Sequence, residues 1–100
     1  MTSIFYLLTK DSPINHWHKN KSDIIHYHLQ GASIRMLLIN AATGEFEEHI
    51  LGQDVFKGEK LQVLVPGNTW KGCYLLDGEY CLTSEAVSPG FAYEDMTLGV

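Results

Sequence analysis

The sequence predicts an all-β fold in which about eight short antiparallel strands roll into a barrel or jelly roll. Apolar runs rich in Ile, Val, Phe, Tyr and Leu recur at short spacing between turn residues, and no segment keeps a helical period over several turns. Two proline-glycine corners, Pro66-Gly67 and Pro89-Gly90, each close one of these runs. A chain of 100 residues with 45% hydrophobic content is the size of one domain, so residues 1–100 are predicted to share a single core.

The first four strands are predicted over residues 3–9, 14–19, 24–30 and 33–40. The first and fourth are nearly continuous apolar runs, whereas the second and third carry histidines at alternate positions. The breaks between these strands contain the turn-forming residues Asp, Ser, Pro, Asn and Gly. These breaks are short, so we expect hairpins to dominate the connections.

The last four strands are predicted over residues 46–51, 61–65, 70–76 and 79–87. Asp77-Gly78, between the last two, is a tight-hairpin signal because both residues can adopt a positive φ. Residues 52–60 form the longest loop without periodicity, and we interpret this loop as a plain surface connection or a mobile lid.

Charge and cysteine content limit the partners and the compartment. The formal net charge is −5, and no run of Lys or Arg is present, so a nucleic-acid backbone would be repelled and is not expected as a partner. The apolar start of the chain is too short for a signal core or a membrane span, which predicts a soluble, cytoplasmic protein without a membrane partner. Cys73 and Cys81 lie inside strand-like runs and are predicted to be reduced, packed thiols.

Four histidines form the strongest chemical pattern in the chain. Side chains alternate along a strand, so His16 and His18 are expected to share one face, and His26 and His28 one face of the next strand. If residues 20–23 are a hairpin turn, the four imidazoles gather on one side and could bind a divalent metal. His16, His18 and His26 would then be ligands beside an open position. The alternative interpretation is that these histidines are half-buried strand residues or face water at a sheet edge.

Strand alternation also places the other polar candidates. Lys71 and Glu85 each share a strand face with the side chains two positions away. Each therefore points inward only if the other side chains on that face also point inward. Gln62 stands in an apolar run and is interpreted as an inward hydrogen-bonding group, and Trp70 as a core anchor or a stacking surface for a planar ligand. The predicted ligand-binding set is His16, His18, His26, His28, Gln62, Trp70 and Lys71.

Together, the order and spacing of short motifs along nearly the whole chain resemble the cupin superfamily, and within it the DUF985 (cupin 5) family of RmlC-like jelly rolls. The motifs are Ile4-Phe5-Tyr6-Leu7-Leu8, Trp17-His18, Ser22-Asp23, Gly31, Leu51-Gly52, Gly58-Glu59, Leu61-Gln62-Val63-Leu64-Val65-Pro66, Thr69-Trp70, Val87-Ser88-Pro89-Gly90-Phe91, Asp95 and Leu98. The resemblance implies a cupin-like double-stranded β-helix and a homodimer. The family pattern begins further upstream than this chain, so the dimer contacts are expected to be altered.

The resemblance also bears on metal binding. Metal-binding cupins use a His-x-His pair, a following Glu, and a His five residues after the proline of the second motif. In this sequence His16 and His18 fill the first two places, but Ile24 and Lys71 stand at the other two, and an ammonium would oppose a nearby cation. His26 or His28 could substitute. No cofactor is therefore expected to be required, and a divalent metal is the less favoured alternative.

The family resemblance implies a small-molecule-binding protein and leaves open whether it is an enzyme. Sugar-nucleotide epimerases of this fold use a His base and a Tyr acid without a metal. The leading hypothesis is therefore a metal-independent isomerase or epimerase that acts on a polar, sugar-like or anionic metabolite. The catalytic candidates are His16, His26, Tyr74, Tyr80 and Glu85. The alternatives are a metal-dependent enzyme that uses the histidine cluster and a non-catalytic, dimeric ligand-binding or scaffold module.

Overall fold

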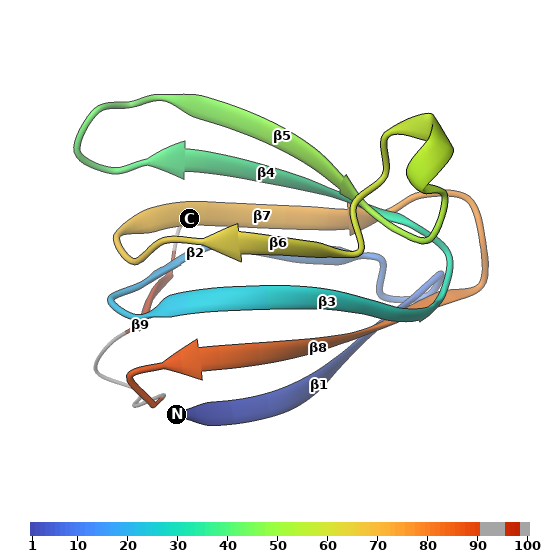
Figure 1. The fold of residues 1–100 in the computed structure, drawn as a ribbon, viewed down its shortest axis with the longest axis horizontal. Coiled ribbons are helices and arrows are strands. Elements are labelled where there is room, and N and C mark those ends of the chain that lie inside the picture. The colour runs from blue at the N-terminus through green and yellow to red at the C-terminus, as the bar shows by residue number, and fades with distance from the viewer. Residues whose placement is uncertain (91–95, 99–100) are drawn as a thin grey trace.

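Two antiparallel β-sheets face each other in the computed structural model, which describes residues 1–90 and 96–98 (Figure 1). The first sheet has the strand order β1-β8-β3-β6 and the second β5-β4-β7-β2-β9. The strands are β1 (Thr2–Thr9), β2 (Ile14–Asn20), β3 (Asp23–Gly31), β4 (Ile34–Asn40), β5 (Phe46–Leu51), β6 (Gln62–Val65), β7 (Thr69–Leu75), β8 (Tyr80–Ser88) and β9 (Met96–Leu98).

The strand pairing is that of a jelly roll. β1 pairs with β8, β2 with β7, β3 with β6, and β4 with β5, as if one long hairpin had been folded over and rolled up. This pairing confirms the predicted all-β jelly roll, and each of the eight predicted strands begins and ends within one residue of an observed strand. The short strand β9, which pairs with β2, was not predicted.

The expectation that hairpins dominate the connections is wrong. Among the described strands, β4 and β5 are the one consecutive pair that is hydrogen-bonded, and the other connections pass between sheets or between strands that do not pair. Asp77-Gly78 is therefore a corner between β7 and β8, which lie in different sheets, rather than a tight hairpin. Residues 20–23 likewise carry the chain from one sheet to the other. Turn chemistry predicts that the chain reverses direction but not which strand it then pairs with.

The predicted corner at Pro66-Gly67 is confirmed, and it packs against the β2–β3 connection. The Gly67 N–H donates to Asp23 Oδ1 over 2.7 Å, and the Asn68 N–H donates to the Asn20 carbonyl over 2.8 Å. A Cβ atom at position 67 would collide with the carbonyl oxygen of Lys21, which explains why this position requires glycine. Two corners 44 positions apart in the sequence thus form one rim of the barrel.

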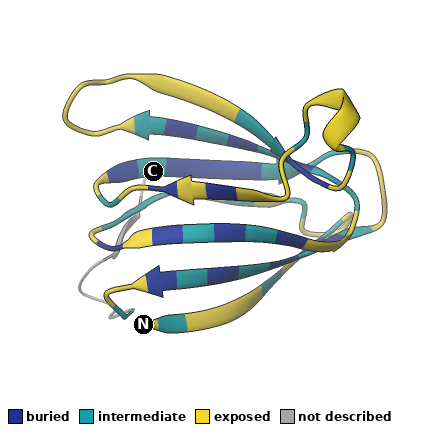
Figure 2. Ribbon diagram, viewed as in Figure 1, coloured by how far each residue is buried: buried dark blue, intermediate teal, exposed yellow. Residues whose placement is uncertain are grey.

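The inner faces of both sheets form the core, and buried residues alternate with less buried ones along β3 and β8 (Figure 2). One apolar cluster contains Leu8, Ile34, Met36, Leu38, Leu51, Val63, Val65, Cys73 and Cys81. Both cysteines are buried free thiols, as predicted, and burial raises the pKa of each to about 11. Charged and titratable side chains from three strands are also buried between the sheets.

Residues 52–60 contain one turn of 3-10 helix, η1 (Val55–Lys57), and are tied to the barrel by a carboxylate. Glu59 Oε1 accepts hydrogen bonds from the Ser33 hydroxyl at 2.7 Å and from the Asp54 N–H at 3.2 Å. These anchors favour the surface connection over the lid. In the described part of the chain, no helix has the length and apolar character needed to cross a membrane.

Candidate functional site

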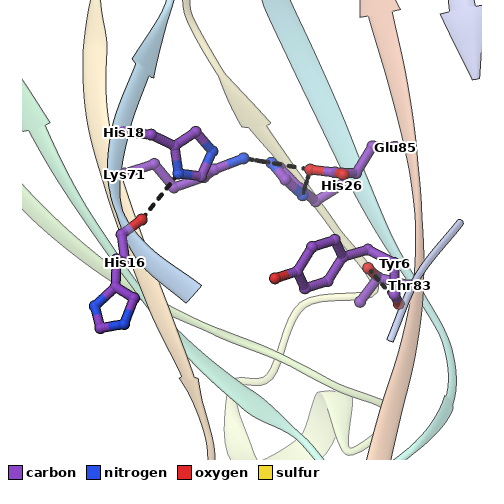
Figure 3. Close-up of polar contacts among 7 residues, drawn as sticks. All are labelled: Tyr6, His16, His18, His26, Lys71, Thr83 and Glu85. Atoms are coloured by element: carbon purple, nitrogen blue, oxygen red, sulfur yellow. Dashed lines mark hydrogen bonds and ion pairs between the residues drawn. The ribbon is translucent and has the colours of Figure 1, made fainter. Parts of the chain in front are cut away.

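Three charged or titratable side chains meet inside the barrel (Figure 3). Lys71 comes from β7, His26 from β3 and Glu85 from β8, so both sheets contribute. Lys71 Nζ lies 2.7 Å from His26 Nε2 and 3.3 Å from Glu85 Oε1, and His26 Nδ1 lies 3.0 Å from the same carboxylate oxygen. Their exposed fractions are only 2%, 4% and 7%, respectively. We call these residues the buried triad.

The hydrogen bonds of the triad are consistent with one arrangement of protons. The Lys71 ammonium donates to His26 Nε2, which must then carry a lone pair. The His26 Nδ1–H donates to Glu85, whose carboxylate also accepts from Lys71. The triad therefore contains one buried ion pair and one neutral imidazole, which satisfies the requirement that buried charges be paired and hydrogen-bonded.

The pKa values in the triad follow from burial and from the neighbouring charges. Burial opposes ionisation of Glu85, but the hydrogen bond from His26 and the charge of Lys71 outweigh it and lower the pKa of the carboxyl to about 2. Burial lowers the pKa of the Lys71 ammonium, and Glu85 opposes this effect. Burial and the adjacent Lys71 charge also lower the pKa of His26, so this imidazole stays neutral at pH 7.

His18, on β2, faces the triad from the second sheet. Its Nδ1–H donates to the carbonyl of His16 over 2.9 Å, which leaves Nε2 as the ring atom with a lone pair. Burial and the Lys71 charge lower the pKa of this half-buried imidazole. His18 and Lys71 line a small cleft at the corner rim, together with Asn20, Ser22, Ile24, Val65, Pro66 and Thr69. His18 is therefore a neutral base beside a buried cation.

Tyr6, on β1, directs its ring into the same interior space (Figure 3). Burial, and then the nearby Cys73 and Glu85 groups, raise the pKa of its hydroxyl, so Tyr6 is protonated at neutral pH and can donate a proton. Sequence reasoning missed this residue as a candidate. The signal was strand alternation, because Tyr6 lies two positions before the buried Leu8 and so shares its inward face.

The structure brings together four of the predicted site residues and separates two others. His18, His26, Lys71 and Glu85 converge, but the expectation that His16 shares a face with His18 is wrong. A register shift between Asn15 and His18 breaks the alternation of β2 and leaves His16 exposed. His28 is buried away from the triad, where its Nε2 bonds to the Ala32 carbonyl at 2.8 Å and its Nδ1 to Gln53 at 2.8 Å.

Other predicted site residues lie outside the barrel interior. The expectation that Gln62 faces inward is wrong, because it is exposed on the edge strand β6. Trp70 and Tyr74 lie on the opposite face of β7 from Lys71, so Trp70 is not a core anchor. Lys19 Nζ stands 5.2 Å from the centre of the Trp70 ring, and the Tyr74 hydroxyl accepts from Arg35 at 3.0 Å. By the same alternation, Tyr80 lies on the opposite face of β8 from Glu85.

These positions do not fit the predicted three-histidine metal site. His16 is exposed, and both ring nitrogens of His26 are engaged by Lys71 and Glu85. In the described residues, no three His, Cys, Asp or Glu side chains are grouped so that they could hold a metal ion. The described interior instead combines a cation, a carboxylate, two imidazoles and a phenol.

Lowering the pH is expected to destabilise the fold, because His18, His26 and Glu85 all have lowered pKa values in the folded state. As the pH is lowered, the unfolded chain binds more protons than the folded chain, so the free energy of unfolding decreases. The histidines contribute to this loss of stability below pH 6.5, their ordinary pKa. Glu85 contributes between pH 4.5, its ordinary pKa, and about pH 2. Urea denaturation at a series of pH values measures the effect. A free energy of unfolding that is constant from pH 7 to pH 3 would contradict this prediction.

Comparisons with known proteins agree with the fold. The family model described as "Cupin superfamily (DUF985)" matches residues 1–99. Uncharacterized protein YML079W from Saccharomyces cerevisiae is 41% identical over 100 residues, which span 96% of this chain and 49% of the yeast protein. The crystal structure of protein SO0799 from Shewanella oneidensis is similar, with a TM-score of 0.89 and 32% identity over 97% of this chain and 60% of that one.

A more distant structure shares the fold alone. The dTDP-4-dehydrorhamnose 3,5-epimerase from Bacillus anthracis has a TM-score of 0.80 and 14% identity, over 98% of this chain and 58% of the epimerase. The chain thus spans about half to three fifths of the length of these three proteins.

Proposed function

The chain belongs to the DUF985 family of the cupin superfamily, and we propose that it binds a polar, anionic or sugar-like metabolite in its barrel and isomerises or epimerises it without a metal. The observation that carries this proposal is the buried triad, which holds Lys71 as a cation between the sheets, within reach of the cleft that His18 lines. The structural similarity to a dTDP-4-dehydrorhamnose 3,5-epimerase supports a carbonyl-containing sugar nucleotide as the first substrate to test.

The proposed reaction moves a proton at a carbon next to a carbonyl group. His18 Nε2 removes the proton, since the hydrogen bond of Nδ1–H to the His16 carbonyl leaves Nε2 with the lone pair of the ring. The Lys71 ammonium stabilises the negative charge that develops on the carbonyl oxygen. Tyr6 then returns a proton from the opposite sheet, which would invert the carbon. His18 and Tyr6 thus replace the base and acid expected from the sequence, and His26 and Glu85 position Lys71.

Proton exchange with solvent tests this function directly. The protein is incubated in D₂O with a thymidine-diphosphate 4-keto sugar, and the signals of the protons next to the carbonyl are followed by NMR. We expect these signals to disappear faster than in buffer alone. The matching sugar nucleotide without the carbonyl serves as the control. If the folded protein neither accelerates exchange nor is stabilised thermally by the keto sugar, this function is wrong.

We also propose that two copies pair through the outer face of the β1-β8-β3-β6 sheet. Phe5, Leu7 and Leu64 point outward there, with exposed fractions of 75%, 55% and 56%. On the neighbouring strands, the outward positions level with Ser3 and Phe5 are the uncharged Ala86, Ser84, Ile25 and Tyr27, and Asp23 lies beyond them at the start of β3. Two chains of net charge −5 can therefore meet there without direct repulsion. Light scattering after size-exclusion chromatography should show a dimer, and Leu7→Glu a monomer. A monomeric parent chain would contradict this interface.

A further inference from the structure

The buried triad has the order of a nucleophile, a base and an orienting carboxylate. Lys71 Nζ lies 2.7 Å from the base His26, and the other ring nitrogen of His26 lies 3.0 Å from Glu85. Activated nucleophiles in enzymes have this arrangement, with the base within hydrogen-bond reach of the nucleophile and held by a third group. In such a triad, the lysine is placed to react as a neutral amine.

A single proton shift would generate that amine. When the proton in the bond between Lys71 and His26 moves to His26 Nε2, the lysine becomes an amine with a free lone pair. The imidazolium that forms is already hydrogen-bonded to the Glu85 carboxylate. The net charge of the triad does not change, so the shift does not add an unpaired charge to the interior. Burial also disfavours the ammonium form, which is consistent with the lowered pKa of Lys71.

We propose that Lys71 forms a Schiff base with the carbonyl carbon of the ligand. The amine lone pair attacks the carbonyl carbon, a C–N bond forms, and the oxygen takes the proton held by His26. One proton on the carbinolamine nitrogen then passes through His26 to the hydroxyl group, the C–O bond breaks and water leaves. A lysine ammonium and a ketone thus give an iminium ion and one water molecule. This inference rests on the proposed function, because it requires a ligand with a carbonyl group.

The position of Lys71 sets it apart from the other lysines. All six lysines lie in the described part of the chain, and Lys71 is the one that is buried. Lys10, for example, pairs with Glu79 on the surface, with 61% of its side chain exposed. Lys71 also lines the same cleft as His18. An iminium ion there would withdraw electrons from the neighbouring carbon, and His18 could remove the proton more easily.

Reductive trapping tests the proposal. The folded protein is incubated at neutral pH with sodium cyanoborohydride and either pyruvate or the thymidine-diphosphate 4-keto sugar, and its peptides are mapped by mass spectrometry. Cyanoborohydride adds hydride to an iminium carbon and fixes the ligand to the lysine as a secondary amine. We expect Lys71 to be modified roughly tenfold or more above Lys10, as an activated amine should be. Lys71→Arg should abolish this modification, and the control Lys10→Arg should retain it.

The outcomes separate this proposal from the proposed function. If neither carbonyl compound modifies Lys71 more than Lys10 in the folded parent protein, the Schiff base is wrong, whether or not the variants fold. If the keto sugar exchanges protons under those conditions without trapping, the isomerase function remains and Lys71 acts only through its charge. If trapping succeeds and exchange fails, the Schiff base remains and the isomerase is wrong.

Discussion

Glu85→Gln is expected to lower the free energy of unfolding by about 3–5 kcal/mol, because it leaves the buried Lys71 ammonium without its counter-charge. The glutamine keeps the size of the side chain, so the loss reports on charge rather than on packing. Urea denaturation at pH 7 measures it. Glu79→Gln is the matched control, since it breaks an exposed pair with Lys10 and should cost only about 0–1 kcal/mol.

Combining Glu85→Gln with Lys71→Met should recover much of this loss, because both charges of the pair are then removed together. A double-mutant cycle gives the coupling free energy between the two residues. Additive effects of the two substitutions would show that the pair does not interact energetically. The same would follow if Glu85→Gln lowered the free energy of unfolding no more than Glu79→Gln does. Either result would contradict the description of the triad as a buried ion pair.

His18→Gln is expected to lower the rate of proton exchange on the keto sugar by about 10²–10⁴-fold, as loss of a general base does. Tyr6→Phe should leave proton removal intact and suppress net inversion, because it deletes only the acid. Ligand binding by both variants, followed by thermal shift, should persist since Lys71 remains. His49→Gln is the control, because His49 contacts Lys60 on the outside of the barrel.

The pH dependence provides a second readout of the same assignment. The base must be unprotonated, so the exchange rate should rise with pH through the lowered pKa of His18, at a pH below 6.5. The acid must be protonated, and because the pKa of Tyr6 is raised above 10, deprotonation of Tyr6 should not limit net inversion below pH 10. An unchanged rate of proton exchange in His18→Gln would show that His18 is not the base.

The strands could be predicted from the sequence because their signal is local. Apolar runs, alternation and turn residues lie within a few positions of one another, and the predicted ends agree with the structure to within one residue. Pairing is not local. The prediction that His16, His18, His26 and His28 share one hairpin failed because β2 and β3 belong to different sheets, a result of how the whole chain rolls up.

The site was predictable in part for the same reason. Alternation correctly predicted that Lys71 and Glu85 point the same way as the side chains two positions away on their strands, and both faces point inward. It failed at His16, because one register shift in β2 exchanges inside and outside, and no residue type marks that shift in the sequence. Which inward residues touch depends on pairing between distant strands. The contact between Lys71 and His26 therefore appears only in three dimensions, across 45 positions of sequence.

The jelly-roll pairing also has a consequence for when the site forms as the protein folds. β1 pairs with β8 alone among the described strands, and the Thr83 hydroxyl reaches the Tyr6 carbonyl across 77 positions. Such nested long-range contacts make folding slow, on the order of milliseconds to seconds for a domain of this kind. A nascent chain emerging from the ribosome has neither Glu85 nor a partner for β1 until β8 has been synthesised. We therefore expect the buried triad to be assembled only after translation has passed β8.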